Sequence, residues 1–268
     1  MSDALERIAD ALERLAGGGA TSTDWLASPA YVWSGDRARA VPAIHAPPLD
    51  LLRGIERQKA SVVGNVKRLA AGHAAHDMLL WGARGMGKSA LLRAAVAQAG
   101  ERLALVQVTH DSLDGLATLF AELAGQDRRF LVFIDDLGFE DGDGDGPRRL
   151  RSWLEGGVEA RPANVRLAVT SNRRAIVPRH HAEQDDPINP RDALDDQLAL
   201  ADRFGLSIGF HNCSQDEYLA IVGGYADAHG LDWEANDALE WSRRRGARSG
   251  RVAWHYVVEL AGRAGKSL

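Results

Sequence analysis

The chain has 268 residues, of which 45% are hydrophobic and 26% charged, with 32 Lys and Arg against 37 Asp and Glu. This composition is typical of a globular protein with one large core and a smaller unit, and the formal net charge of −5 argues against a dedicated nucleic-acid-binding or membrane-coating role. A single cysteine, Cys213, excludes a disulfide framework and a zinc site built on paired cysteines. No apolar stretch reaches the ~20 residues of a membrane span. The acidic, amphipathic N-terminus does not resemble a secretion signal, so we expect a cytoplasmic protein.

Residues 1–47 are expected to form an N-terminal helix and an irregular connector. Apolar residues at helical spacing predict a helix over residues 4–16, which either packs on its own core or self-associates. The segment from Trp25 to Pro48 is rich in Pro and aromatic residues, and it predicts irregular structure. A further helix is expected over Leu51–Ala71, although Gly54 and Gly64 disfavour it.

From residue 48 to residue 212, short apolar runs alternate with helical stretches. The expected strands are Met78–Trp81, Leu103–Val108, Phe130–Ile134, Arg166–Thr170 and Gly205–Phe210, and the helices between them cover residues 88–99, 112–124, 147–160 and 192–203. Strands alternating with helices predict an α/β fold whose parallel sheet is covered on both faces. Residues 213–268 change character and predict three consecutive helices, at 214–229, 233–245 and 251–263.

The strongest motif is the segment Gly82-Ala-Arg-Gly-Met-Gly87-Lys88-Ser89, which fills the pattern G-x-x-x-x-G-K-[ST] between an apolar strand and an Ala/Leu-rich helix. Glycines allow successive backbone N–H groups to approach phosphates. Lys88 is expected to contact the β- and γ-phosphates, and the Ser89 hydroxyl to bind Mg²⁺. The expected nucleotide contacts are Gly82, Ala83, Arg84, Gly85, Met86, Gly87, Lys88, Ser89 and Ala90.

Polar residues follow two further strands. Asp135 and Asp136 end the run Leu131-Val-Phe-Ile, at the sheet edge where parallel sheets bind ligands. Asp135 is the candidate for Mg²⁺ binding, and Asp136 is the candidate for polarising the attacking water, with Glu140 in reserve. Asn172 follows the next strand and could hold a water or the γ-phosphate, although Asn at a strand end is commonly a turn residue. The absence of an Asn-Lys-x-Asp motif disfavours a GTPase.

Two arginines complete the candidate site. Arg203 lies at the end of an expected helix, directly before the fifth expected strand, and Arg251 begins the last expected helix. For each residue the alternative is an ordinary surface ion pair.

These elements, in this order, resemble the AAA+ ATPases, and in particular an uncharacterised, mostly bacterial branch of predicted P-loop ATPases of unknown function. The resemblance covers roughly residues 48–263 and is carried by LLWGARGMGKSALLRA, FLVFIDDLGFEDGD, LEGGVEARPANVRLAVTSNRR, LADRFGLSIGF, QDEYLAIVGGYA and RRGARSGRVA. It implies a three-layer αβα core with a five-stranded parallel sheet (48–212) and a small helical lid (213–268). It also implies ATP and Mg²⁺ as cofactors and assembly into a homo-oligomer. In that family pattern Lys88 and Ser89 contact phosphate and Mg²⁺, and the acidic pair is Asp135 and Asp136. Asn172 is the first sensor and Arg251 is the second. Arg203 is an arginine finger that acts on the site of the neighbouring subunit.

The leading interpretation is therefore an oligomeric ATPase that remodels or switches an unknown protein client. The alternative is a slowly hydrolysing, ATP-dependent binding module or loader, which the short Asp136 side chain slightly favours. Arginine clusters leave a nucleic-acid partner possible but not favoured, and a small-molecule kinase fits less well because the helical unit follows the sheet. The acidic loop at Asp141–Asp145 lacks the Glu of a calcium loop, and the pair His180-His181 lacks metal-site spacing, so neither is taken as a metal site.

Overall fold

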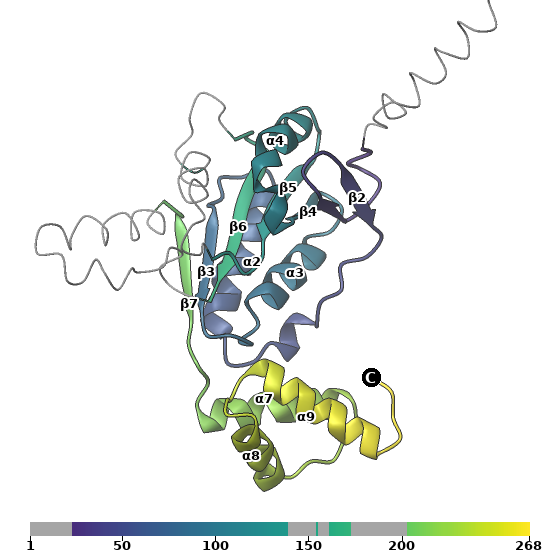
Figure 1. The fold of residues 1–268 in the computed structure, drawn as a ribbon, viewed down its shortest axis with the longest axis vertical. Coiled ribbons are helices and arrows are strands. Elements are labelled where there is room, and N and C mark those ends of the chain that lie inside the picture. The colour runs from purple at the N-terminus through teal and green to yellow at the C-terminus, as the bar shows by residue number, and fades with distance from the viewer. Residues whose placement is uncertain (1–22, 139–153, 155–160, 173–202) are drawn as a thin grey trace, which may run out of the picture.

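The computed structural model describes residues 23–138, 154, 161–172 and 203–268 (Figure 1). In chain order the described elements are β1 (Ala30–Trp33), β2 (Ala38–Val41), the short 3₁₀ helix η1 (Leu49–Leu51), α2 (Glu56–Ala70), β3 (Met78–Gly82), α3 (Lys88–Ala99), β4 (Leu103–Val108), η2 (His110–Gly115), α4 (Leu116–Ala124), β5 (Arg129–Ile134), β6 (Val165–Ser171), β7 (Leu206–Phe210), α7 (Gln215–Ala228), α8 (Ala235–Arg244) and α9 (Gly250–Arg263). The expected N-terminal helix, the expected helices at 147–160 and 192–203, and Glu140 lie outside the described residues, apart from Leu154, the one helical residue described in 147–160.

The sheet is larger than the sequence predicted. Its strand order is β2-β1-β4-β5-β6-β3-β7, and every neighbouring pair is parallel except β1 with β2. The five expected strands are present as β3 to β7, but the expected total of five is wrong because the described sheet has seven strands. The two additional strands come from the segment that was expected to be an irregular connector.

Strands β1 and β2 form because contacts distant in sequence fix this segment. Tyr31 and Trp33 of β1 are buried, as is Trp25 before it. The backbone just before β1 is held by Arg128, whose guanidinium donates to the carbonyls of Trp25 (2.9 Å) and Ser28 (2.7 Å). The segment rich in Pro and aromatic residues therefore forms a short hairpin at the edge of the sheet. Pro is tolerated at a sheet edge.

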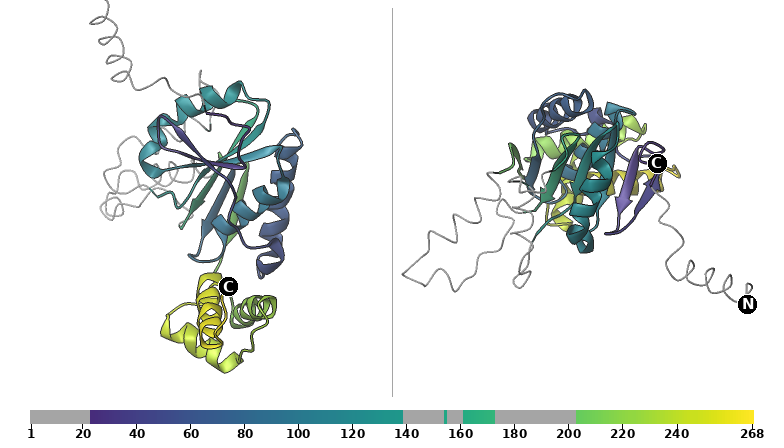
Figure 2. Two further views of the ribbon diagram at one scale, coloured as in Figure 1. Left: turned by 90° about the vertical axis from the view of Figure 1, so that its right-hand side faces the viewer. Right: turned by 90° about the horizontal axis from the view of Figure 1, so that it is seen from above.

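The sheet is covered on both faces, as expected for an α/β fold. Successive strand residues point to opposite faces. Leu80, Leu105 and Phe133 belong to a core that also contains residues of α2, α3 and the C-terminal helices. Leu79 and Val106, one position away along their strands, belong to a second core with α4. Figure 2 shows the resulting layers.

The C-terminal helices α7, α8 and α9 form a separate group at one end of the sheet (Figure 1). Each expected helix is found within two residues of its predicted ends. Ser214 caps α7 in a reciprocal arrangement with Glu217, and Ser249 caps α9 by accepting from the Val252 N–H. Upstream, α2 begins at Glu56 rather than Leu51, because Gly54 adopts a left-handed backbone with φ of 76°.

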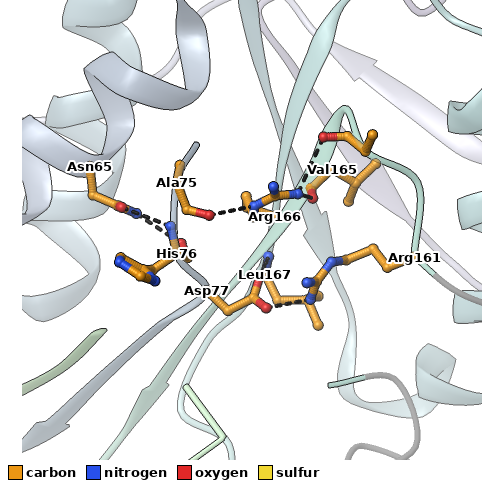
Figure 3. A network of polar contacts seen from close by, with 9 residues as sticks. Asn65, Ala75, His76, Asp77, Arg161, Val165, Arg166 and Leu167 are labelled. Carbon is orange, nitrogen blue, oxygen red and sulfur yellow. Dashed lines mark hydrogen bonds and ion pairs between the residues drawn. The ribbon is translucent and has the colours of Figure 1, made fainter. Parts of the chain in front are cut away.

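A buried polar network secures the amino ends of β3 and β6 (Figure 3). Asp77 accepts from the Leu167 N–H (2.7 Å) and forms an ion pair with Arg161 (2.5 Å). Arg166 donates to the carbonyl of Ala75, and its pKa is lowered mainly by burial. These contacts fix the position of β3 relative to β6, and therefore the positions of the two carboxyl ends that carry the candidate site. Among the described residues, no helix is both long and apolar enough to cross a membrane.

Candidate nucleotide site

The glycine-rich segment forms a tight loop between β3 and α3. Gly82 has φ of 118°, and a Cβ there would overlap the carbonyl of Phe210 in β7. The same carbonyl accepts from the Ala83 N–H (2.7 Å), so the loop begins hydrogen-bonded to the end of the edge strand. Helix α3 begins at Lys88, so its N-terminal N–H groups and dipole face the loop. This is the geometry of an anion site at a helix N-terminus.

Lys88 is buried and its ammonium group is held by three oxygen atoms. It donates to the carbonyls of Gly82 (2.8 Å) and Ala83 (2.9 Å) and to Asn172 Oδ1 (3.2 Å). Burial lowers the pKa of Lys88; the charges of Asp136 and Asp135 oppose this effect, and those of Arg251 and Arg84 add to it. Lys88 is therefore a desolvated cation whose charge interacts with those of two aspartates and two arginines. Such a group of charges is a favourable setting for binding an anion.

Asp135 lies beside Ser89, as a shared Mg²⁺ site requires. The Ser89 hydroxyl donates to Asp135 Oδ1 (2.5 Å), so its lone pairs remain for a metal ion. Among the described residues no group of three or more His, Cys, Asp or Glu could hold a metal by itself. One hydroxyl and one carboxylate do fit Mg²⁺, which is commonly bound by few protein oxygens together with nucleotide phosphates.

Asp136 and Asn172 contact each other directly. The amide Nδ2 of Asn172 donates to Asp136 Oδ1, while its Oδ1 accepts from Lys88. Asp136 has φ of 52°, and it is the one residue other than glycine with a positive φ in the part of the chain that the structure describes. Backbone of this kind costs free energy and concentrates at functional sites.

Helix α9 meets the loop from the C-terminal helices. The Arg251 N–H donates to the carbonyl of Gly85 (3.0 Å), and Ser249 and Arg251 are the neighbours that a Cβ at Gly85 would contact. Arg251 thus lies at the glycine-rich loop of its own chain. Met86 is buried in the core next to α3, and Ala90 is half-buried against it.

Arg203 lies away from this cluster. It precedes β7, whose first residue Leu206 pairs with Met78, whereas the last residue Phe210 pairs with Gly82. Arg203 therefore lies at the amino end of β7, whereas the glycine-rich loop lies at its carboxyl end. The two are about 15 Å or more apart along the strand direction. The structure does not bring Arg203 to the loop of its own chain.

One member of the cluster, Thr170, was not predicted from the sequence. Its hydroxyl donates to Asp135 Oδ1 (2.6 Å) and accepts from the Asp136 N–H (2.7 Å). A threonine in a strand is unremarkable by composition, and its position two residues before Asn172 was the available signal.

A family model described as "Protein of unknown function (DUF815)" matches residues 26–264. The chain belongs to the DUF815 family. The match includes the hairpin of β1 and β2, which the resemblance to AAA+ ATPases did not cover. No curated protein matches the chain.

Among solved structures, this DUF815 member is similar to RuvB of Thermotoga maritima, a Holliday junction branch migration motor, with a TM-score of 0.54 and 15% identity over 82% of this chain and 66% of that one. One variant of the same RuvB matches with a TM-score of 0.55 and 16% identity, over 82% of this chain and 67% of that one. A second variant matches with a TM-score of 0.54 and 17% identity, over 79% of this chain and 64% of that one. The likeness confirms the expected α/β fold with a mostly parallel sheet. At this identity it concerns the fold alone.

Proposed function

We propose that the protein binds MgATP at the loop Gly82–Ser89 and hydrolyses it to ADP and phosphate. The observation that carries the proposal is one hydrogen-bonded cluster, in which Thr170 joins Lys88, Asn172 and Asp136 on one side to Ser89 and Asp135 on the other. These residues lie at the start of α3 and directly after the strands β5 and β6, which are distant in sequence. Their convergence beside a helix N-terminus supports phosphate chemistry over a purely structural turn.

Each residue has a distinct role in this proposal. Lys88 exchanges the carbonyls of Gly82 and Ala83 for phosphate oxygens. The negative charge of the phosphates then compensates for the burial of its positive charge. Ser89 and Asp135 hold Mg²⁺, and the metal would supply positive charge against the phosphate oxygens. Asp136 accepts a proton from the attacking water, and Asn172 orients that water or the terminal phosphate.

The two arginines act on the phosphates from outside the loop in this proposal. Arg251 reaches the phosphates from α9, so the helices α7–α9 serve as a lid. Arg203 acts on the site of a neighbouring subunit, since it lies at the other end of the sheet from its own loop. The protein would then work as a cytoplasmic homo-oligomer on a macromolecular client. The net charge of −5 supports a protein client over the nucleic-acid function named for RuvB.

The proposal is tested by measuring ATP binding and hydrolysis for wild-type protein, Lys88→Ala and Asp136→Asn. We expect Lys88→Ala to lose binding, and Asp136→Asn to retain binding but lose at least ~100-fold in turnover, the scale of general-base catalysis. Lys67→Ala, an exposed lysine of α2, is the matched control and should behave as wild type. Equal nucleotide binding by wild type and Lys88→Ala would overturn the proposal.

A second candidate function is an ATP-dependent loader that hydrolyses slowly. It is favoured by the contact in which Asn172 engages the short Asp136 carboxylate and Lys88 together. A carboxylate held in this way is less available to a water molecule. Asp136→Glu should then raise turnover several-fold, because the longer side chain reaches further. A lower rate in Asp136→Glu would favour the faster ATPase.

A further inference from the structure

Strands β5 and β6 lose their regular pairing where the two aspartates emerge. At the start of this pair the Phe130 N–H donates to the Asn164 carbonyl, and at its end the Leu137 N–H donates to the Thr170 carbonyl. Between these two bonds the β5 side contains one residue more than the β6 side, as in a β-bulge. The additional residue moves the Asp136 N–H out of register with the main-chain acceptor that a regular ladder would provide.

The Thr170 side chain replaces that acceptor. Its hydroxyl oxygen accepts from the Asp136 N–H at 2.7 Å, and Asp136 stays in the left-handed conformation with φ of 52°. Without this acceptor the donor would be unpaired at a position where the backbone is already strained. Thr170 thereby determines in which direction the Asp136 side chain leaves the strand.

The hydroxyl proton of Thr170 has a second task. It is donated to Asp135 Oδ1 at 2.6 Å, the oxygen that also accepts from Ser89. Thr170 is 1% exposed, so solvent does not compete for this hydrogen bond. The Thr170 hydroxyl therefore donates to Asp135, the residue proposed to hold Mg²⁺. The same hydroxyl accepts from the backbone N–H of Asp136, the residue proposed to act on water.

We infer that Thr170 is the positioning residue of this site, which orients Asp135 toward the metal and fixes Asp136 toward the water. The inference rests on the proposed function and adds a residue to it. Mutation of a residue that orients a metal ligand by hydrogen bonding typically costs about 10- to 100-fold in metal affinity or activity. The ordinary alternative is that Thr170 is present because β-branched residues suit strands.

Two nearly isosteric variants separate these explanations. Thr170→Val keeps the branched shape and removes the hydroxyl, whereas Thr170→Ser keeps the hydroxyl and removes the methyl group. ATP hydrolysis is measured against Mg²⁺ concentration, and binding of a fluorescent ATP analogue is measured in EDTA and in Mg²⁺. We expect Thr170→Val to need about 10-fold more Mg²⁺ for half-maximal activity and to lose about 10- to 100-fold in maximal rate, while binding in EDTA stays unchanged. Thr170→Ser should stay close to wild type in every measurement.

The inference is overturned if Thr170→Val keeps the Mg²⁺ dependence of wild type, or if Thr170→Ser is impaired as much as Thr170→Val. Should Thr170→Val fail to fold, Thr170→Ala against Thr170→Ser gives the same comparison with and without a hydroxyl. Failure of the proposed function has a different signature, which is wild-type protein that binds the ATP analogue no better than Lys88→Ala. That result would overturn the nucleotide site and the role of Thr170 together.

Discussion

The main-chain N–H of Arg251 donates to the main-chain carbonyl of Gly85 across 3.0 Å and so joins α9 to the middle of the glycine-rich loop. A Cβ at Gly85 would lie 2.8 Å from Ser249 Oγ and 3.0 Å from Arg251 Cβ. The loop and the first turn of α9 are therefore in direct backbone contact. We therefore expect a change in the conformation of the loop to move the C-terminal helices.

Gly85→Ala tests this coupling. The residue has φ of 75°, so the new methyl group adds backbone strain to the steric contact with Ser249. We expect a loss of about 1–2 kcal/mol in the free energy of unfolding, and at least ~10-fold weaker ATP binding because α9 is displaced. Urea denaturation and nucleotide titration measure the two effects. Gly64→Ala in α2 has open space around it and should stabilise the protein by about 0.5–1 kcal/mol without affecting binding. Unchanged ATP affinity in Gly85→Ala would show that the contact is incidental.

The position of Arg203 leads to a prediction about mixed oligomers. Lys88→Ala has a defective site but an intact Arg203, and Arg203→Ala has the reverse. If Arg203 serves the neighbouring subunit, each variant alone is inactive, and an equimolar mixture recovers a measurable part of wild-type ATPase activity. Arg37→Ala, an arginine exposed beside Asp36, is the control and should remain fully active alone. A mixture as inactive as its components, although it co-assembles, would rule out action between subunits.

Local signals in the sequence predicted much of the site. The loop and the start of α3 were found because Gly-x-x-x-x-Gly-Lys-Ser combines a phosphate-binding pattern with a helix of Ala and Leu, and α3 spans the predicted residues 88–99. Asp135 and Asp136 were found because a fully apolar strand precedes them. In each case the residues that determine the structure are neighbours in sequence.

Other features depend on contacts that no local pattern reveals. Strand β1 is four residues long, and the backbone just before it is fixed by Arg128, which is about 100 residues away in sequence. The role of Thr170 depends on one additional residue directly after β5, which becomes visible only when β5 and β6 are paired. The sequence could show that a threonine was present, but not that a backbone N–H would need its hydroxyl.

The buried ion pair between Asp77 and Arg161 should be important for stability and not for nucleotide affinity. Their side chains are 8% and 16% exposed, and they lie at the amino end of β3, away from the loop. Arg161→Met leaves the Asp77 charge without its partner, so we expect a loss of about 3 kcal/mol in the free energy of unfolding. The double variant with Asp77→Asn should recover part of this loss, because neither charge of the pair remains.

A double-mutant cycle by urea denaturation measures the coupling between the two residues. The matched control is Arg263→Met, which breaks an exposed pair with Glu259 and should cost no more than about 0.5 kcal/mol. Losses that simply add in the double variant would contradict the prediction, since they would show that the two charges do not interact.

Tyr218 of α7 should make stability dependent on pH in the alkaline range. Its side chain is fully buried and donates to the Ala238 carbonyl (3.2 Å). Burial, with smaller contributions from Tyr256 and Cys213, raises the pKa of Tyr218 to about 12. Because the tyrosine in the unfolded chain ionises near pH 10, the contribution of Tyr218 to stability is complete below pH 10 and is lost as the pH rises from 10 to 12. A shift of this size corresponds to about 2–3 kcal/mol.

Tyr218→Phe isolates this contribution. The variant lacks the hydrogen bond to Ala238 and should be about 1 kcal/mol less stable than wild type at pH 8. Above pH 10 the stability of wild type should fall more steeply, because the variant has no group to ionise at this position. Tyr225 and Tyr256 also have raised pKa values because they are buried, and they contribute equally to both proteins. The quantity to plot, from pH 8 to pH 12, is therefore the difference in the free energy of unfolding between wild type and Tyr218→Phe. A difference that does not change with pH would show that Tyr218 ionises as easily in the folded helices as in the unfolded chain.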